Sequence, residues 1–75
     1  MNSLRRIRQE NNLSQLQVAI AIKQNERSIA NIEMGKQKLS LEDAVKLAEL
    51  YHITVDEIYK AFKEDIKVNG EMSLK

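Results

Sequence analysis

The chain has 75 residues, enough for one domain and too few for two hydrophobic cores. Hydrophobic residues make up 43% and charged residues 31%, a balance typical of a globular protein and not of a disordered chain. The sequence has no Cys and one His, which excludes disulfides, thiolate metal sites and multi-histidine sites. It has no apolar run near the ~18 residues of a membrane span and no signal-peptide pattern, so we expect a soluble, cytoplasmic protein without a membrane partner.

The net charge of +1 hides an uneven distribution. Residues 1–38 contain seven Lys or Arg and three Glu, a net charge of +4. Residues 39–75 contain five basic and eight acidic residues, a net charge of −3. Such asymmetry suggests a polyanion bound on one side of the molecule, with a chance split of surface charges as the alternative.

The first half of the chain has the pattern of three short helices, each preceded by a polar residue able to cap a helix N-terminus. These cap residues are Asn2 or Ser3, Ser14 and Asn25. The first helix is expected to end at residues 11–12, because Asn tolerates the left-handed conformation found at many helix ends. Ser14 and Gln17 predict a capping box on the second helix. Residues 23–25 predict a turn, and the third helix is expected over about 26–34.

The second half predicts two further helices. Ser40 caps the fourth, whose apolar residues follow the helical period. These residues are Leu41, Ala44, Val45, Leu47, Ala48 and Tyr51. Thr54 and Glu57 predict a capping box on the fifth helix, which is expected to end at about Lys67. Its apolar residues, at spacings of three and four, are Val55, Ile58, Tyr59, Phe62 and Ile66.

The dipeptide Asn69-Gly70 has two interpretations. Asn-Gly is a hairpin signal, but a two-residue hairpin at this position would leave no apolar face. A helix end followed by a loose tail is the interpretation we prefer. The chain is therefore predicted to form one domain over residues 1–67, with a flexible tail over residues 68–75.

The sequence has little that supports catalysis. It contains no nucleophile elbow, no phosphate-cradling Gly loop and no cluster of metal ligands. The acidic pairs at 42–43 and 64–65 are expected to be solvated helix faces. His52 follows a helix end, where a structural role is the simpler interpretation. We therefore expect no enzyme, no metal and no cofactor.

Residues 15–34 have the pattern of two short helices joined by a tight turn, the helix-turn-helix unit. Ala19 is the small residue that lets the second helix of the unit cross the first closely. A helical wheel places one set of residues inward: Ile29, Ile32 and Glu33. It places another set outward: Arg27, Ala30, Asn31 and Met34. An outward Arg and Asn suit the major groove of DNA, because Arg can bond guanine and Asn can bond adenine bidentately. The alternative is an ordinary solvated helix face.

The chain resembles the small phage-repressor-like, xenobiotic-response-element-type helix-turn-helix proteins over about residues 4–59. The matching residues are Leu4, Ile7-Arg8, Leu13-Ser14-Gln15, Val18-Ala19, Ile22, Ser28-Ile29, Ile32-Glu33, Gly35-Lys36, Ser40 and Ile53-Thr54-Val55-Asp56-Glu57-Ile58. The resemblance implies an all-α, five-helix lambda-repressor-like domain, with the helix-turn-helix at helices two and three and helix three as the recognition helix. It also implies a structural pair between Arg8 and Glu33, so neither is expected to read bases.

The resemblance further implies which residues contact DNA. The residues expected to face base edges are Glu26, Arg27 and Asn31. Those expected at the DNA backbone or at a helix start are Gln15, Lys23, Gln24, Asn25, Ser28, Lys36 and Lys38. The lysines among them would supply salt-dependent affinity and not sequence choice.

The sequence departs from the family pattern at four positions. Lys23 stands where the family usually has Gly, so a left-handed turn there would carry a steric cost. Asn12 replaces another Gly and is better tolerated, and Leu39 stands where Pro is frequent. Glu26 is acidic at a DNA-facing position, where it would accept from cytosine, favour the helix dipole or repel unwanted sequences.

These features predict a sequence-specific transcriptional regulator, in particular a repressor, that binds double-stranded DNA as a homodimer on a two-fold operator. Phe62 and Ile66 are expected to lie beyond the edge of the monomer core and to form the dimer interface. No effector pocket is expected, so regulation would come from concentration, autoregulation or a regulatory protein partner.

Two kinds of alternative remain open. An antitoxin or a restriction-modification controller would have the same fold. A protein-binding module without DNA function is also consistent with Leu16 and Ile20, four residues apart at positions that are usually polar in the family. These two residues would form either an exposed apolar patch or an ordinary, partly covered surface.

Overall fold

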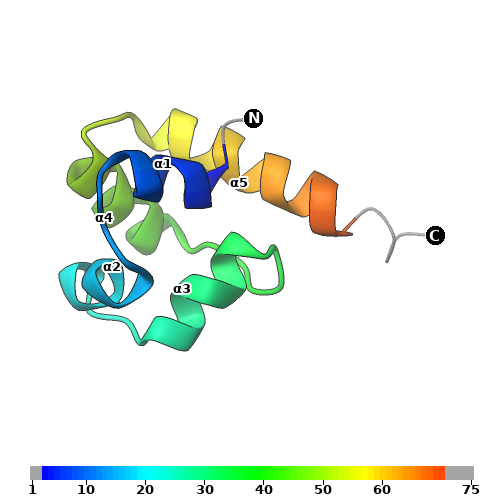
Figure 1. Cartoon of the computed structure of the whole chain (residues 1–75). Coiled ribbons are helices and arrows are strands. Elements are labelled where there is room, and N and C mark those ends of the chain that lie inside the picture. The colour runs from blue at the N-terminus through cyan, green and yellow to red at the C-terminus, as the bar shows by residue number, and fades with distance from the viewer. Residues whose placement is uncertain (1–2, 71–75) are drawn as a thin grey trace.

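The computed structural model describes the backbone of residues 3–70 and the side chains of residues 3–64. This part of the chain contains five α-helices and no strand. The helices are α1 (Leu4–Glu10), α2 (Gln15–Ile22), α3 (Glu26–Glu33), α4 (Leu41–Tyr51) and α5 (Val55–Gly70). The predicted all-α, five-helix fold is confirmed. In Figure 1, α2 and α3 lie together on one side, while α1, α4 and α5 lie on the other.

The predicted cap residues begin the helices as expected. The side chains of Ser3, Ser14, Asn25 and Ser40 each accept a hydrogen bond from the backbone N–H three residues later. The capping box at Ser14 is complete, because its N–H also donates to the Gln17 side chain, with a nitrogen–oxygen distance of 2.8 Å. At Thr54 the hydroxyl accepts from the N–H of Glu57, but among the described contacts the N–H of Thr54 does not donate to the Glu57 carboxylate, so this predicted capping box is half formed. Local sequence therefore determines where each helix begins.

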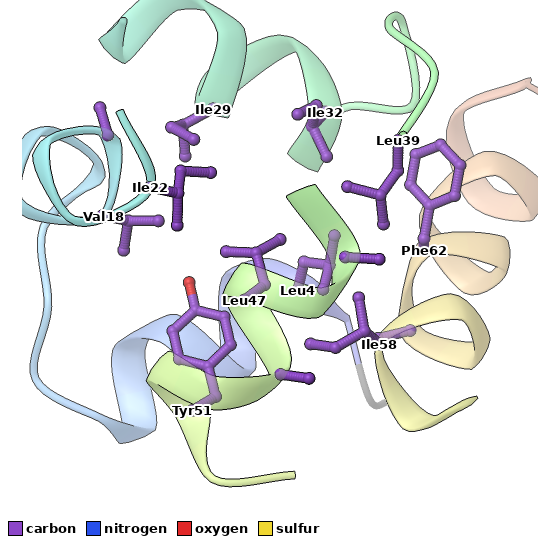
Figure 2. Close-up of a cluster of buried hydrophobic side chains, with 14 residues drawn as sticks. Leu4, Val18, Ile22, Ile29, Ile32, Leu39, Leu47, Tyr51, Ile58 and Phe62 are labelled. Carbon is purple, nitrogen blue, oxygen red and sulfur yellow. The ribbon is translucent and has the colours of Figure 1, made fainter. Parts of the chain in front are cut away.

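The hydrophobic core lies where the two groups of helices meet. Val18 and Ile22 of α2 point toward α4, as do Ile29 and Ile32 of α3 (Figure 2). The side chains with almost no exposed surface are Leu4, Val18, Ile22, Ile32 and Ile58. Every helix contributes at least one side chain to this cluster, so the orientation of α2 and α3 depends on the rest of the domain.

Phe62 is part of this core, which corrects the expectation that it has nowhere to bury within one chain. Its exposed fraction is 8%. The segment between α3 and α4 brings Leu39 beside it (Figure 2), and this Leu side chain is itself buried. Tyr59, one turn earlier on α5, donates a hydrogen bond to the carbonyl oxygen of Leu39. Phe62 is therefore not exposed for the dimer contact that the sequence predicts. The side chain of Ile66, the other residue of that predicted contact, lies outside the described residues.

The fifth helix extends past its predicted end at Lys67. It continues to Gly70, so Asn69 and Gly70 are helical and do not form a hairpin turn. The first three residues of the predicted tail thus belong to α5, and residues 71–75 lie outside the described part of the chain. In Figure 1 the end of α5 projects beyond the other helices.

The turn position Lys23 has the left-handed conformation that the family resemblance implies, with φ 59° and ψ 44°. Asn12 is also left-handed, as expected for an Asn at a helix end. His52, which follows α4, is left-handed too, and the sequence analysis did not anticipate this. Lys and His both carry a Cβ that disfavours this region, so each of these two turns stores local strain.

We expect Lys23→Gly to stabilise the fold by about 0.5–1 kcal/mol, because Gly removes a left-handed cost of roughly 1–2 kcal/mol but gains freedom in the unfolded chain. Urea denaturation followed by circular dichroism measures the difference. Lys60→Gly is the control, since Gly within an exposed helical turn should destabilise by about 1 kcal/mol. A Lys23→Gly protein less stable than the original chain would contradict the prediction.

Candidate nucleic-acid interface

The helix-turn-helix unit consists of α2, the three-residue turn Lys23–Asn25 and α3. Ala19 is completely buried, and this allows α3 to cross α2 closely. The turn is closed by a 2.8 Å hydrogen bond from the N–H of Gln24 to the carbonyl oxygen of Ala19. Asn25 then begins α3 by accepting from the N–H of Ser28 at 2.7 Å. Local capping and close packing together determine the angle between the two helices.

The third helix has the two faces that the wheel predicts. Ile29, Ile32 and Glu33 are buried, with exposed fractions of 2%, 2% and 8%. Glu26, Arg27 and Met34 are exposed, whereas Ser28, Ala30 and Asn31 are half-buried. The outer face therefore presents a guanidinium and a carboxamide one helical turn apart, beside the carboxylate of Glu26. These are groups that can hydrogen-bond to base edges in a major groove.

Arg8 and Glu33 form a bidentate ion pair beneath α3. Arg8 Nε lies 2.7 Å from Glu33 Oε2, and Nη2 lies 3.1 Å from Oε1. Nη1 donates to the carbonyl oxygen of Leu13, so one guanidinium joins α1, the following loop and α3. The hydrogen bond with Glu33 holds the pKa of Arg8 above its usual value, despite the opposing effect of burial. The pair is a structural brace and is not available to DNA.

Tyr51 packs close to this ion pair. Burial raises the pKa of Tyr51 well above its usual value, and the nearby charge of Glu33 raises it further. The phenol is therefore neutral at all ordinary pH values. The Tyr51 ring also lines a small, partly open cavity of about 10 Å³, together with Leu4, Val18, Ile29, Ile32, Glu33 and Leu47.

Two glutamines that the sequence assigned to DNA contacts are engaged within the protein. Gln15 donates from Nε2 to Glu33 Oε1 at 3.2 Å, which ties the start of α2 to the end of α3. Gln24 donates from Nε2 toward both carboxylate oxygens of Asp43 at 3.3 Å. Neither contact follows from local sequence patterns, because each joins residues 18 or 19 positions apart.

Four basic side chains in and beside the helix-turn-helix unit have no ion-pair partner among the described residues: Lys23, Arg27, Lys36 and Lys38. All four are exposed. They come from the turn, from α3 and from the loop after it, where left-handed Gly35 and a 2.8 Å bond from the N–H of Lys36 to the carbonyl oxygen of Asn31 end the helix. Unpaired cations beside an exposed helix face are suited to phosphate contacts.

The residues of α4 that face the turn were missed by the sequence analysis. Lys46 donates from Nζ to the carbonyl oxygen of Ile22, the last residue of α2, at 3.4 Å. Asp43 was assigned to a solvated helix face, but its exposed fraction is only 6%. The helical period alone places Asp43 beside Leu47, so a wheel centred on the apolar stripe would have found it.

The chain matches the helix-turn-helix family over residues 4–58. Comparisons with curated proteins and with solved structures give no significant match. The chain belongs to the helix-turn-helix family of the xenobiotic-response-element and Cro type. This is a DNA-binding regulatory family and is not typically enzymatic, so the protein is a DNA-binding helix-turn-helix regulator.

Among the described residues, none of the helices combines the length and the hydropathy that a membrane-spanning segment needs. Within the same residues, no group of three or more His, Asp or Glu side chains is arranged to hold a metal ion.

Proposed function

We propose that the protein is a sequence-specific transcriptional repressor of the cytoplasm that binds a two-fold DNA operator as a homodimer. The outer face of α3 carries this proposal. Arg27 and Asn31 would read bases there, with Glu26 either accepting from a cytosine or rejecting other sequences. Lys23, Lys36 and Lys38 would contact phosphates around them, together with the helix starts at Gln15, Asn25 and Ser28.

Selection of bound DNA from a random pool at defined salt tests the proposal directly. A repressor of this kind should recover a site with two-fold symmetry and half-sites about one DNA turn, roughly 34 Å, apart. Recovery of unrelated sequences with no shared motif would contradict sequence-specific binding. Repression is then checked by placing the recovered site in front of a reporter gene and expressing the protein.

Arg27→Ala and Lys36→Ala should have different effects on DNA binding. Arg27→Ala is expected to cost about 1–3 kcal/mol at one base pair and to relax the preference there. Lys36→Ala is expected to weaken all sequences alike and to lower the salt slope of binding by about one. Titrations across base variants and salt concentrations measure both effects. An unchanged base preference in Arg27→Ala would remove that residue from the reading face.

For the homodimer, the exposed apolar surface of α4 supports a different interface from the one expected. Leu41 and Val45 lie one turn apart and are 65% and 40% exposed. Asp43 and Lys46 face α2 through their contacts with the turn, which leaves Leu41 and Val45 on the other side of α4. We place the two-fold contact on these two residues, with Ile66 of α5 retained from the sequence-based proposal.

Leu41→Glu should abolish dimerisation and weaken operator binding while leaving the monomer folded, because the Leu41 side chain is mostly in solvent. Sedimentation, circular dichroism and a DNA titration measure the three properties. Ile20→Glu introduces the same charge at a similarly exposed apolar residue of α2 and is the control for folding and dimerisation, which it should leave unchanged. A Leu41→Glu protein that still dimerises would show that the contact lies elsewhere.

A surface on α2 supports a second candidate function, the binding of a regulatory protein partner. Leu16 and Ile20 are 51% and 70% exposed, so a large part of each apolar side chain is open to contact with a partner. A protein-binding module without DNA function would show no salt-dependent binding to DNA, whereas a regulator with an additional partner would. An antitoxin or a restriction-modification controller would also bind DNA, and the gene beside this one would separate those roles.

A further inference from the structure

Two side chains of α4 hold the turn between α2 and α3. The amino group of Lys46 lies 3.4 Å from the carbonyl oxygen of Ile22, immediately before the turn. Both carboxylate oxygens of Asp43 lie 3.3 Å from Nε2 of Gln24, within the turn. The two contacts reach the chain on either side of Lys23, so α4 supports the residues directly before and after this left-handed position.

The helix that supplies these contacts is itself firmly placed. Ala44 and Leu47 of α4 are buried in the core, with exposed fractions of 0% and 3%. Asp43 donates its N–H to the hydroxyl of Ser40, and its carboxylate lies in the first turn of α4, where the helix dipole favours a negative charge. Lys23, in contrast, has a strained left-handed backbone conformation. Such a conformation persists only where contacts from the surrounding structure hold it, and α4 supplies those contacts here.

The turn determines the direction in which the recognition helix leaves it. Gln24 immediately precedes Asn25, the residue that caps α3, and Arg27 follows two residues later. A bidentate contact between Arg and guanine tolerates little displacement, because both of its hydrogen bonds have fixed directions. The flexible lysines beyond the other end of α3 can follow a phosphate when the helix moves. A loosened turn should therefore affect base reading more than phosphate binding.

We propose that Asp43 and Lys46 are positioning residues for sequence recognition, which hold the turn so that Arg27 meets the base edges in one orientation. Gln24 receives this support from Asp43 and does not serve as a phosphate contact. The inference rests on the proposed DNA-binding function. It assigns to α4 an influence on base preference although neither positioning residue belongs to the reading face.

The variants that test this proposal remove or restore the hydrogen bonds that Lys46 and Asp43 make with the turn. Lys46→Met keeps the apolar stem and removes the donor, whereas Lys46→Arg restores a donor. Lys60→Met is the matched control, because Lys60 also pairs with an acidic residue four positions earlier but lies on α5. Asp43→Ala removes the acceptor for Gln24. Circular dichroism identifies any variant that has lost its fold.

The first measurement needs no DNA. Amide hydrogen exchange at Gln24 reports opening of the turn, since the hydrogen bond from that N–H to the carbonyl oxygen of Ala19 closes the turn onto α2. Loss of one hydrogen bond predicts exchange that is roughly three- to tenfold faster in Lys46→Met and Asp43→Ala. Lys60→Met and Lys46→Arg should exchange like the original chain. Unchanged exchange in both Lys46→Met and Asp43→Ala overturns the proposal.

The second measurement compares the selected operator with a variant changed at the base pair that Arg27 reads. The ratio of the two affinities is expected to fall by roughly three- to tenfold in Lys46→Met and to recover in Lys46→Arg. The salt dependence of DNA binding by Lys46→Met should match that of Lys60→Met. A preserved ratio in Lys46→Met overturns the positioning role alone. A chain that selects no sequence from the random pool overturns the proposed function itself, whatever the exchange experiment shows.

Discussion

Glu33→Ala is expected to lower the free energy of unfolding by about 3–5 kcal/mol, because it leaves the buried guanidinium of Arg8 without its counter-charge. The two side chains of the pair are 10% and 5% exposed, so water cannot replace the lost carboxylate. Gln15 loses its acceptor in the same variant. Small domains lie toward the low end of the usual range of about 5–15 kcal/mol, so the variant should keep only about 0–2 kcal/mol of stability and unfold at a much lower urea concentration.

Urea denaturation followed by circular dichroism measures this loss. Glu10→Ala is the matched control, since Glu10 pairs with Arg6 at the surface and its removal should change stability by less than about 1 kcal/mol. The double variant Arg8→Met, Glu33→Leu should be more stable than either single variant, because no buried charge is left unpaired. Single variants no less stable than Glu10→Ala would show that the pair is not a brace.

Phe62→Ala is expected to cost about 3–5 kcal/mol, and Phe62→Glu at least as much, because the second also places a carboxylate in the core. At 8% exposure, this ring lies among the buried side chains of one chain. Phe62→Glu should therefore sediment as an unfolded chain and not as a folded monomer. Circular dichroism should show loss of helical signal together with loss of cooperative unfolding.

Leu41→Glu is the informative comparison for Phe62→Glu. Both place a carboxylate at an apolar position, but Leu41 is 65% exposed, so the free energy of unfolding should change little. A Phe62→Glu protein with the helical signal and cooperative unfolding of the original chain would contradict the burial of this ring. Helix α5 would then regain Phe62 as a candidate dimer contact.

Local sequence was sufficient to predict the five helices, whereas the left-handed conformation of Lys23 was implied by the family's usual Gly at that position. Cap residues such as Ser14 and Asn25 act within three positions along the chain, and the apolar period determines which side of a helix is buried. Both effects can be read from neighbouring residues. For the same reason the wheel separated the inner face of α3, at Ile29 and Ile32, from its outer face.

The burial of Phe62 and the partner of Gln24 depend on tertiary contacts that the sequence does not predict. Phe62 is buried because the loop after α3 brings Leu39 against α5. The spacing of apolar residues within α5 cannot predict a contact with a residue of a distant loop. Gln24 donates to the carboxylate of Asp43, a residue 19 positions away, and local sequence does not predict this partner. Helical period assigns a residue to one side of its own helix, whereas its partner is determined by how the chain brings distant segments together.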